Sequence, residues 1–398
     1  MLATPLARSA IAVAMALLVS ACSGTTATPS PTVAPTTAPT AAPTPTPTPS
    51  GTPAPTPTPR PTVLPAIEAN TTKVALTKIP VPPDAGKTVS MDIFEIDQDA
   101  HLLYIADRLT NGVDIFDIAT PAAKFVKAID AGSGANGITV AKNVNKLYAG
   151  LNDGNIAIID IDPKSAKVNT VIVKLASGGK GRADEMDYDP KDKKLYVANS
   201  NDGIVNVIDG VTDKIIKKFE NLGDGLEQPR YNASDGMMYM TASDQNAIFQ
   251  FDPRTDVMVK KFDVVAKCNP NGLAINPTTN QALLGCSAGR IGSNGVPITV
   301  AWDLATGKAL ATFEQAGAGD STIYDPKIDR FFFGAHNFNR GSVIAVFTGS
   351  PTIKFVTNVP MGEFAGSKNL AYDQTNDLIY TQDGLPGDGS IFSFKPPR

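Results

Sequence analysis

One unit of about 45 residues recurs along most of this 398-residue chain and limits what the chain can fold into. Its clearest copy is Lys193–Asp209, KKLYVANSNDGIVNVID, in which two short runs of β-branched, aromatic and apolar residues flank the turn residues Ser200–Gly203. This pattern predicts a β-hairpin. A strand over Met186–Pro190, ended by its proline, precedes the hairpin, and a strand over Ile215–Phe219 follows it. The unit is therefore a meander of four short strands.

The unit is repeated seven times. The centre of its second strand is aromatic or apolar in each copy, at intervals of 43 to 48 residues: Tyr104, Tyr148, Tyr196, Tyr239, Leu284, Phe332 and Tyr380. Five of the seven third strands end in an aspartate that favours a turn: Asp117, Asp160, Asp209, Asp252 and Asp303. Seven such copies predict an all-β chain, a seven-bladed β-propeller. The last copy stops after its third strand, so we expect Lys73–Pro80 to complete that blade and close the ring.

The N-terminal residues are not expected to belong to the hydrophobic core of the propeller. Residues 1–21 carry one basic residue, Arg8, before the apolar run Ala10–Val19, which fits a secretory signal peptide. The next residues, Val19-Ser20-Ala21-Cys22, resemble the lipobox of bacterial lipoproteins, which implies a lipid on Cys22; the alternative is ordinary cleavage beside an incidental cysteine. Residues 22–66 are rich in Thr and Pro and are expected to form a disordered stalk. We therefore expect an exported protein, anchored by lipid to the extracytoplasmic face of a bacterial membrane, with its propeller over residues 67–398.

Several copies resemble a known repeat family. The segments DYDPKDKKLYVANSNDGIVNVIDGVTDKII, INPTTNQALLGC and AYDQTNDLIYTQDG resemble the bacterial YVTN or YncE-like β-propeller repeats. The resemblance covers essentially everything beyond the stalk. It implies the propeller fold, and it implies no shared catalytic motif, because members of the family resemble one another through blade construction.

Two cysteines remain after Cys22. Cys268 precedes the inner strand Gly272–Asn276, and Cys286 ends the next strand, Ala282–Cys286, so an antiparallel hairpin would bring them together. We expect a disulfide, which an exported location permits. Buried free thiols and a redox or metal-binding pair are the alternatives. Similarly placed cysteine pairs in some members of the resembled family support the disulfide.

Other classes of function find little support. The formal net charge is −4 with scattered basic residues, which argues against nucleic acid as a partner. The chain has no Gly-x-Ser-x-Gly, Cys-x-x-Cys-His or His-Glu-x-x-His motif, and its two histidines, His101 and His336, lie at non-equivalent points of their copies. Asp-rich turns such as Asp187–Asp192 lack the glycine and distal glutamate of a calcium loop and fit Asx-turns. We therefore expect no metal site and no cofactor.

The centre of the ring is the candidate site. In a propeller the inner strands line an axial channel, and the residues at their starts converge on one face. Here those residues are polar and of mixed charge: Asp92, Asn136, Asp184, Glu185, Gln228, Arg230, Asn269, Asn271, Asp320, Lys368 and Asn369. Converging polar groups in a concavity predict a ligand site. The alternative is that any water-filled channel mouth is polar.

The sequence thus favours a monomeric binding or scaffolding module for a protein, a glycan or a small ligand. The second hypothesis is a lactonase-like hydrolase, because related seven-bladed propellers include lactonases. In that case Asp184, Glu185, Arg230 and Asp320 would supply the acid, the base and the oxyanion-stabilising group. The lack of a catalytic motif places binding first.

Overall fold

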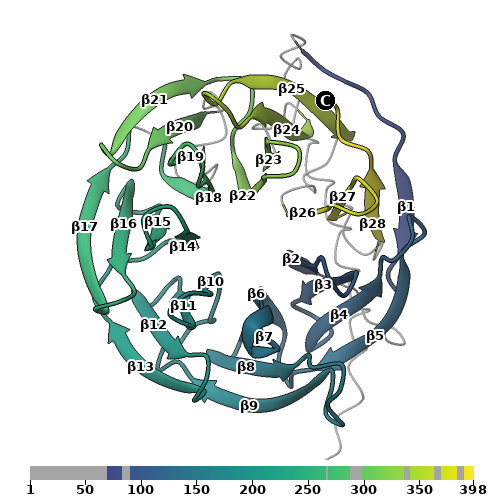
Figure 1. Ribbon diagram of the computed structural model, residues 1–398, viewed down its shortest axis with the longest axis vertical. Helices are drawn as coiled ribbons and strands as arrows, with labels where there is room; N and C mark the ends of the chain where they lie inside the picture. Colours follow the sequence, from purple (N-terminus) through teal and green to yellow (C-terminus); the bar gives the residue numbers. More distant parts are fainter. Residues whose placement is uncertain are drawn as a thin grey trace, which may run out of the picture. The chain divides into compact units, whose positions relative to one another are not determined.

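Seven four-stranded antiparallel sheets form a ring in the computed structural model (Figure 1). The structure describes residues 70–82, 90–265, 268–286, 298–335, 341–362, 369–382 and 390–398. Each sheet is one blade, with its first strand at the centre of the ring and its last at the rim. The predicted all-β, seven-bladed β-propeller is confirmed. Within the described ranges, no helix is long and apolar enough to cross a membrane.

The blades follow one another along the chain. Blade 1 consists of β2 (Met91–Asp97), β3 (Leu102–Asp107), β4 (Gly112–Asp117) and β5 (Lys124–Asp130). Blade 2 consists of β6 (Ala135–Ala141), the 3₁₀ turn η1 (Lys142–Val144), β7 (Lys146–Leu151), β8 (Asn155–Asp160) and β9 (Thr170–Ala176). Blade 3 consists of β10 (Met186–Asp189), β11 (Lys194–Asn199), β12 (Ile204–Asp209) and β13 (Lys214–Phe219).

The second half of the ring repeats this order. Blade 4 consists of β14 (Leu226–Asn232), β15 (Met237–Ala242), β16 (Ala247–Asp252) and β17 (Val257–Asp263). Blade 5 consists of β18 (Pro270–Asn276), β19 (Gln281–Cys286), β20 (Thr299–Asp303) and β21 (Lys308–Phe313). Blade 6 consists of β22 (Gly319–Asp325), β23 (Arg330–Ala335), β24 (Ser342–Thr348) and β25 (Phe355–Gly362). Blade 7 consists of β26 (Leu370–Asp373), β27 (Leu378–Gln382), β28 (Ser390–Phe394) and β1 (Thr77–Pro80).

The N-terminal strand closes the ring, as predicted. β1 pairs antiparallel with β28 over Thr77–Pro80 and forms the rim strand of blade 7. Regular pairing begins four residues later than Lys73 because the preceding segment lies against a different blade. There Asn358 of β25 donates its N–H to the carbonyl of Asn70 and accepts the N–H of Thr72, both at 2.9 Å. The segment therefore ties blade 6 to blade 7.

The hydrophobic core is divided among the seven junctions between neighbouring blades. All seven second-strand positions counted in the sequence are buried there, with at most 1% of each residue exposed. Burying a residue such as Leu284 or Phe332 contributes about 1.5–3 kcal/mol. The five third-strand aspartates each accept the backbone N–H two residues further on, at 2.8–3.0 Å. The turns predicted at these positions are confirmed, and they are Asx-turns.

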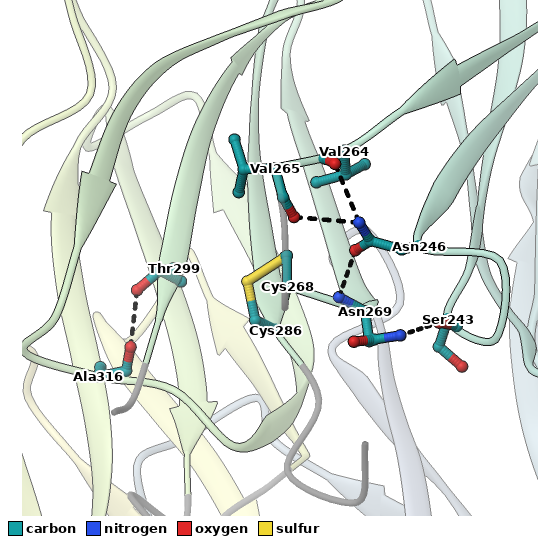
Figure 2. The surroundings of a disulfide bond; sticks show 9 residues. All are labelled: Ser243, Asn246, Val264, Val265, Cys268, Asn269, Cys286, Thr299 and Ala316. Carbon is teal, nitrogen blue, oxygen red and sulfur yellow. Dashed lines mark hydrogen bonds between the residues drawn. A yellow bond between two sulfur atoms is a disulfide. The ribbon is translucent and has the colours of Figure 1, made fainter. Parts of the chain in front are cut away.

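The predicted disulfide is present between Cys268 and Cys286, at the junction of blades 4 and 5 (Figure 2). Both cysteines are fully buried, and their Cα atoms lie 4.6 Å apart. The approach to β18 is fixed by Asn246, whose Nδ2 donates to the carbonyl of Val264 (2.9 Å) and whose Oδ1 accepts the N–H of Asn269 (2.6 Å). A bridge across a sequence separation of 18 contributes about 3 kcal/mol in the chain-entropy model.

Two glycines set how closely the inner strands approach one another. A Cβ on Gly137 would lie 2.0 Å from the carbonyl oxygen of Asp184, and one on Gly272 would lie 2.4 Å from that of Asp320. Any larger residue would push the next inner strand away. These glycines therefore place Asp184 and Asp320 at the centre of the ring.

Candidate functional site

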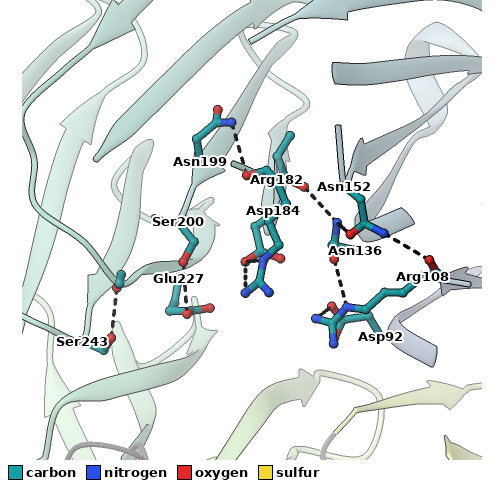
Figure 3. Close-up of polar contacts among 12 residues, drawn as sticks. Asp92, Arg108, Asn136, Asn152, Arg182, Asp184, Asn199, Ser200, Glu227 and Ser243 are labelled. Atoms are coloured by element: carbon teal, nitrogen blue, oxygen red, sulfur yellow. Dashed lines mark hydrogen bonds and ion pairs between the residues drawn. The ribbon is translucent and has the colours of Figure 1, made fainter. Parts of the chain in front are cut away.

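The channel mouth is the end of the ring at which the inner strands begin. In β2, β6, β14, β18 and β22 the pairing register shifts just after the first residue, so a β-bulge interrupts the alternation of side chains. In β14, Leu226 pairs with Ala242 and Pro229 pairs with Met240, which leaves two residues opposite one. One of these two, Glu227, points into the mouth (Figure 3).

One side of the mouth is a connected polar network that joins blades 1 and 2 (Figure 3). A hydrogen bond from Asn369 extends this network to blade 7. The guanidinium of Arg108 contacts the carboxylate of Asp92 and donates from Nε to Asn136 Oδ1 at 2.9 Å. Asn136 Nδ2 in turn donates to Asn152 Oδ1 at 3.1 Å, and Asn369 Nδ2 donates to Asp92 Oδ1 at 3.0 Å. The structure thus brings together three residues predicted for the site. Hydrogen bonds among these side chains connect three blades, which indicates a bracing role, although Asn369 Oδ1 has no hydrogen-bond partner among the described residues.

Asp184 lies next along the mouth and is held by one arginine. Arg182 Nε donates to Asp184 Oδ2 at 2.7 Å, and the arginine side chain is about one-third exposed. Burial raises the pKa of the Asp184 carboxyl, although the charge of Arg182 opposes that effect. Asp184 is therefore a buried acid whose charge is only partly compensated.

Three further carboxylates form a cluster at the mouth, which we call the carboxylate cluster. Its members are Glu185 of blade 3, Glu227 of blade 4 and Asp320 of blade 6. One carboxylate oxygen from each lies within 4.8 Å of the other two. Ser200 Oγ donates to Glu227 Oε1 at 3.3 Å. Like charges this close repel one another unless protons or a positively charged group neutralise them.

Burial and the nearby charges shift the pKa values of two members of the cluster, Glu185 and Glu227. Burial raises the pKa of the Glu185 and Glu227 carboxyls well above the ordinary value of 4.5. The charges of Asp184 and Asp320 raise both further, while the guanidinium of Arg230 lowers the pKa of Glu185. Glu185 and Glu227 therefore retain protons at a pH where exposed glutamates have lost them.

Below the mouth the channel contains a cavity of about 220 Å³. Its lining includes Glu95, Glu185, Asp187 and Arg230. Arg230 Nη1 lies 4.0 Å from Glu185 Oε2, and Arg230 Nη2 donates to the buried Gln228 Oε1 at 3.1 Å. Burial and the charge of Asp187 raise the pKa of Glu95 to about 8. Charged groups thus continue from the mouth into the channel.

The remaining residues predicted for the channel mouth contribute less to its polar network. Asn271 is half-buried, and its carbonyl accepts a hydrogen bond from Thr241 Oγ1 at 2.7 Å. Asn269 Nδ2 donates to the carbonyl of Ser243 at 2.7 Å and so braces the junction of blades 4 and 5. Three residues singled out in the sequence lie outside the described residues, together with the predicted signal peptide (1–21) and stalk (22–66): Cys22, His336 and Lys368. The predictions for these parts stay predictions.

Sequence reasoning missed five charged residues of the channel: Glu95, Arg108, Arg182, Asp187 and Glu227. Asp187 follows Glu185 by two residues, so the period of a strand could have placed both on the channel face. Arg108 and Arg182 come from loops rather than inner strands. For Glu227 the bulge in β14 removes the alternation on which such a prediction would depend.

Comparisons with known proteins support the fold and identify no family. No protein-family model and no curated protein matches the chain. Among solved structures 1675 chains match, including one from "Crystal Structure of Mitotic Checkpoint Complex". That chain has a TM-score of 0.63 and 14% sequence identity, with 84% of this chain and 95% of that chain covered. The protein is a seven-bladed β-propeller, a fold that suits a binding or scaffolding module.

Proposed function

We propose that the protein is a binding module that takes up a positively charged ligand at the channel mouth. The carboxylate cluster carries this proposal. Its three members, Glu185, Glu227 and Asp320, each place a carboxylate oxygen within 4.8 Å of the other two. Buried charges of one sign are costly unless they are paired. A cationic ligand complements this site.

The sequence supports presentation of the propeller outside the cell. The lipobox-like end of the signal peptide provides a lipid anchor at Cys22, and the Thr/Pro-rich stalk spaces the propeller from the membrane. A Cys22→Ser variant should move the protein from the membrane fraction to the soluble fraction. Retention of the variant in the membrane fraction would contradict the anchor.

Ligand-dependent thermal unfolding of the full chain tests binding at the mouth. The probes are divalent cations, polyamines and amino sugars, each with a neutral or anionic counterpart. A ligand present at 100 times its Kd stabilises the folded state by about 2.7 kcal/mol. We expect at least one cationic probe to raise the Tm of the wild type and of the rim control Asp263→Asn, which changes an exposed residue at the end of β17. The same probe should leave Glu227→Gln unchanged. Equal shifts in all three proteins, or stabilisation by anions alone, would contradict the proposal.

A lactonase-like hydrolase is the second candidate, and one observation favours it. Burial keeps the Glu185 carboxyl protonated above its ordinary range, and the Arg230 guanidinium lies 4.0 Å away, so an acid and a positive group face the same cavity. If the protein is an enzyme, an Asp184→Ala, Arg230→Ala double variant should lose lactone turnover. No turnover by the wild-type protein would rule this candidate out.

A further inference from the structure

The rim strands of blades 3, 4 and 5 follow one another along the outside of the ring, on the left of Figure 1. These strands, β13, β17 and β21, share one backbone feature. In each, the pairing with the third strand shifts by one residue and leaves an aliphatic residue opposite none: Ile216, Val259 and Leu310. A β-bulge of this kind re-aims the side chain of the extra residue. The three side chains are about half exposed, so the fold places apolar groups at equivalent points of three neighbouring blades.

β17 is the most exposed of the three strands. Val257 and Met258 come just before the bulge and are 50% and 37% exposed, and Phe262 is the one buried residue of the strand. Single exposed aliphatic residues are ordinary on protein surfaces, whereas a group of them on adjacent strands is typical of an interaction surface. This part of the rim therefore has the apolar half of a docking site.

The same three strands are strongly basic. They contain six lysines and one acidic residue, Asp263, although the whole chain has a formal net charge of −4. The aspartates that precede β13 and β17 are engaged by the neighbouring blade, Asp213 by Lys146 and Asp256 by Lys194. Among the described residues, none of the six lysines forms an ion pair. The basic residues are scattered along the sequence, and the ring gathers six of them on one stretch of rim.

We call this stretch the rim patch. It comprises an aliphatic residue and a lysine from each strand: Ile216 and Lys217, Val259 and Lys260, and Leu310 and Lys308. Its lysines and its bulges oppose edge-to-edge pairing with a second copy of the chain. Its charge complements an anionic partner, and its aliphatic side chains stand on an outward-curving surface (Figure 1). A bilayer with anionic headgroups meets both conditions, because aliphatic side chains enter the interface while lysines approach the phosphates.

We propose that the rim patch docks on the surface of a membrane that contains anionic phospholipids. The predicted stalk permits this contact. Residues 22–66 reach on the order of 100 Å when extended as polyproline II. Two blades facing each other across the channel span roughly 40–50 Å, at about 4.8 Å per strand, so any part of the rim can reach the membrane that holds the anchor. The tether also raises the effective concentration of the rim at that membrane, so a weak contact suffices.

This inference goes beyond the proposed function, because the rim patch shares no residue with the channel mouth. Docking by the outside of the ring leaves the mouth open to its ligand.

Co-sedimentation with lipid vesicles tests the inference. The soluble Cys22→Ser chain is mixed with vesicles of phosphatidylglycerol and phosphatidylcholine, or of phosphatidylcholine alone. We expect binding to the anionic vesicles to be at least tenfold tighter than to the neutral ones. Binding should weaken in about 0.5 M NaCl, because salt screens the lysines.

A matched pair of charge variants, made in the Cys22→Ser chain, locates the contact. Lys217→Glu, Lys260→Glu should weaken binding to anionic vesicles at least tenfold. The control, Lys124→Glu, Lys354→Glu, changes the net charge equally, at exposed lysines on the rim of blades 1 and 6, on the right of Figure 1. It should bind within about twofold of the parent chain, since screening leaves distant charges with little effect.

A second pair tests the apolar contact. Val259→Ser should weaken binding several-fold, whereas Val126→Ser, at the equivalent bulge of β5 in blade 1, should not. Circular dichroism checks that all variants are folded. Equal binding to both kinds of vesicle would overturn the inference, and so would equal effects of the patch and control substitutions. None of these results depends on the channel mouth, so cation binding there is tested separately.

Discussion

Glu95 lies on β2 inside the channel, where burial and the charge of Asp187 raise the pKa of its carboxyl to about 8. Arg230 opposes this effect without cancelling it. A carboxyl that keeps its proton near neutrality avoids the cost of a buried charge. The acid–base behaviour of this side chain is therefore set by the ring and differs from that of the unfolded chain.

This shift predicts that the folded protein becomes less stable as pH rises. Between the ordinary pKa of 4.5 and the folded value of about 8, the unfolded chain has released the proton of Glu95 and the folded chain has kept it. The free energy of unfolding should therefore fall across that range. Urea unfolding at pH 5 and pH 8 should show a smaller fall in Glu95→Gln than in the wild type. An equal fall in both proteins would contradict the shift.

In two blades, a lysine at the start of the second strand forms polar contacts with the next blade. Lys194 Nζ donates to the carbonyl of Pro253 at 2.5 Å and contacts both Asp256 oxygens at 2.8 Å. Lys146, one blade earlier, donates to the carbonyl of Gly210 at 2.7 Å and is paired with an aspartate in the same way. The Lys-Leu-Tyr sequence of these copies thus includes an interblade contact as well as a buried tyrosine.

Lys194→Met should destabilise the protein by about 2 kcal/mol, because the charged hydrogen bonds are lost while the aliphatic stem is kept. Lys124→Met, at an exposed position on the rim strand β5, serves as the control and should change stability by less than about 0.5 kcal/mol. Chemical denaturation measures both. Equal effects of the two substitutions would show that the interblade contact contributes nothing.

At the scale of elements, the rim strands carry residues that oppose edge-to-edge pairing with another chain. β13 and β17 carry exposed aliphatic residues such as Ile216 (45%) and Val259 (54%), and they also carry lysines, for example Lys217 and Lys261. Lysine on an edge strand opposes pairing with a second chain. β1 has the additional task of covering the edge of β28, which would otherwise lie open.

Deletion of Lys73–Pro80 should therefore lower the Tm or cause aggregation, since it opens the ring between blades 7 and 1 and exposes β28. A deletion of the same length within the predicted stalk, residues 36–43, should leave the Tm unchanged. Differential scanning calorimetry with light scattering measures both effects. A soluble, monomeric variant without Lys73–Pro80 and with the wild-type Tm would contradict closure by β1.

At the scale of the whole molecule, the fold could be predicted because its information is local and repeated. Each blade carries its own turn aspartate or buried aromatic, and Tyr148, Tyr196 and Tyr239 mark three successive second strands. The missing fourth strand of blade 7 was also predictable, because a ring with an open edge would be unstable.

The candidate site could be predicted only in part. The sequence predicts Glu185 and Asp320 as site residues because they lie at the starts of inner strands, but in blade 4 it predicts Gln228 instead of Glu227. The bulge in β14 turns Glu227 into the mouth and buries Gln228 completely, and no periodic pattern in the sequence records that bulge. The convergence of Glu185, Glu227 and Asp320 depends on ring closure rather than on local spacing.

Native mass spectrometry tests the central claim, that the closed ring takes up a cation at its mouth. The sample is the Cys22→Ser chain, purified from an exporting host without chelator, with Glu227→Gln in the same background as the comparison. We expect one bound cation per wild-type chain and none on the Glu227→Gln chain. The cation should be lost on denaturation and, if it is a divalent ion, on EDTA treatment. A bare wild-type chain that remains bare after exposure to millimolar Ca²⁺ and the other cationic probes would contradict the account.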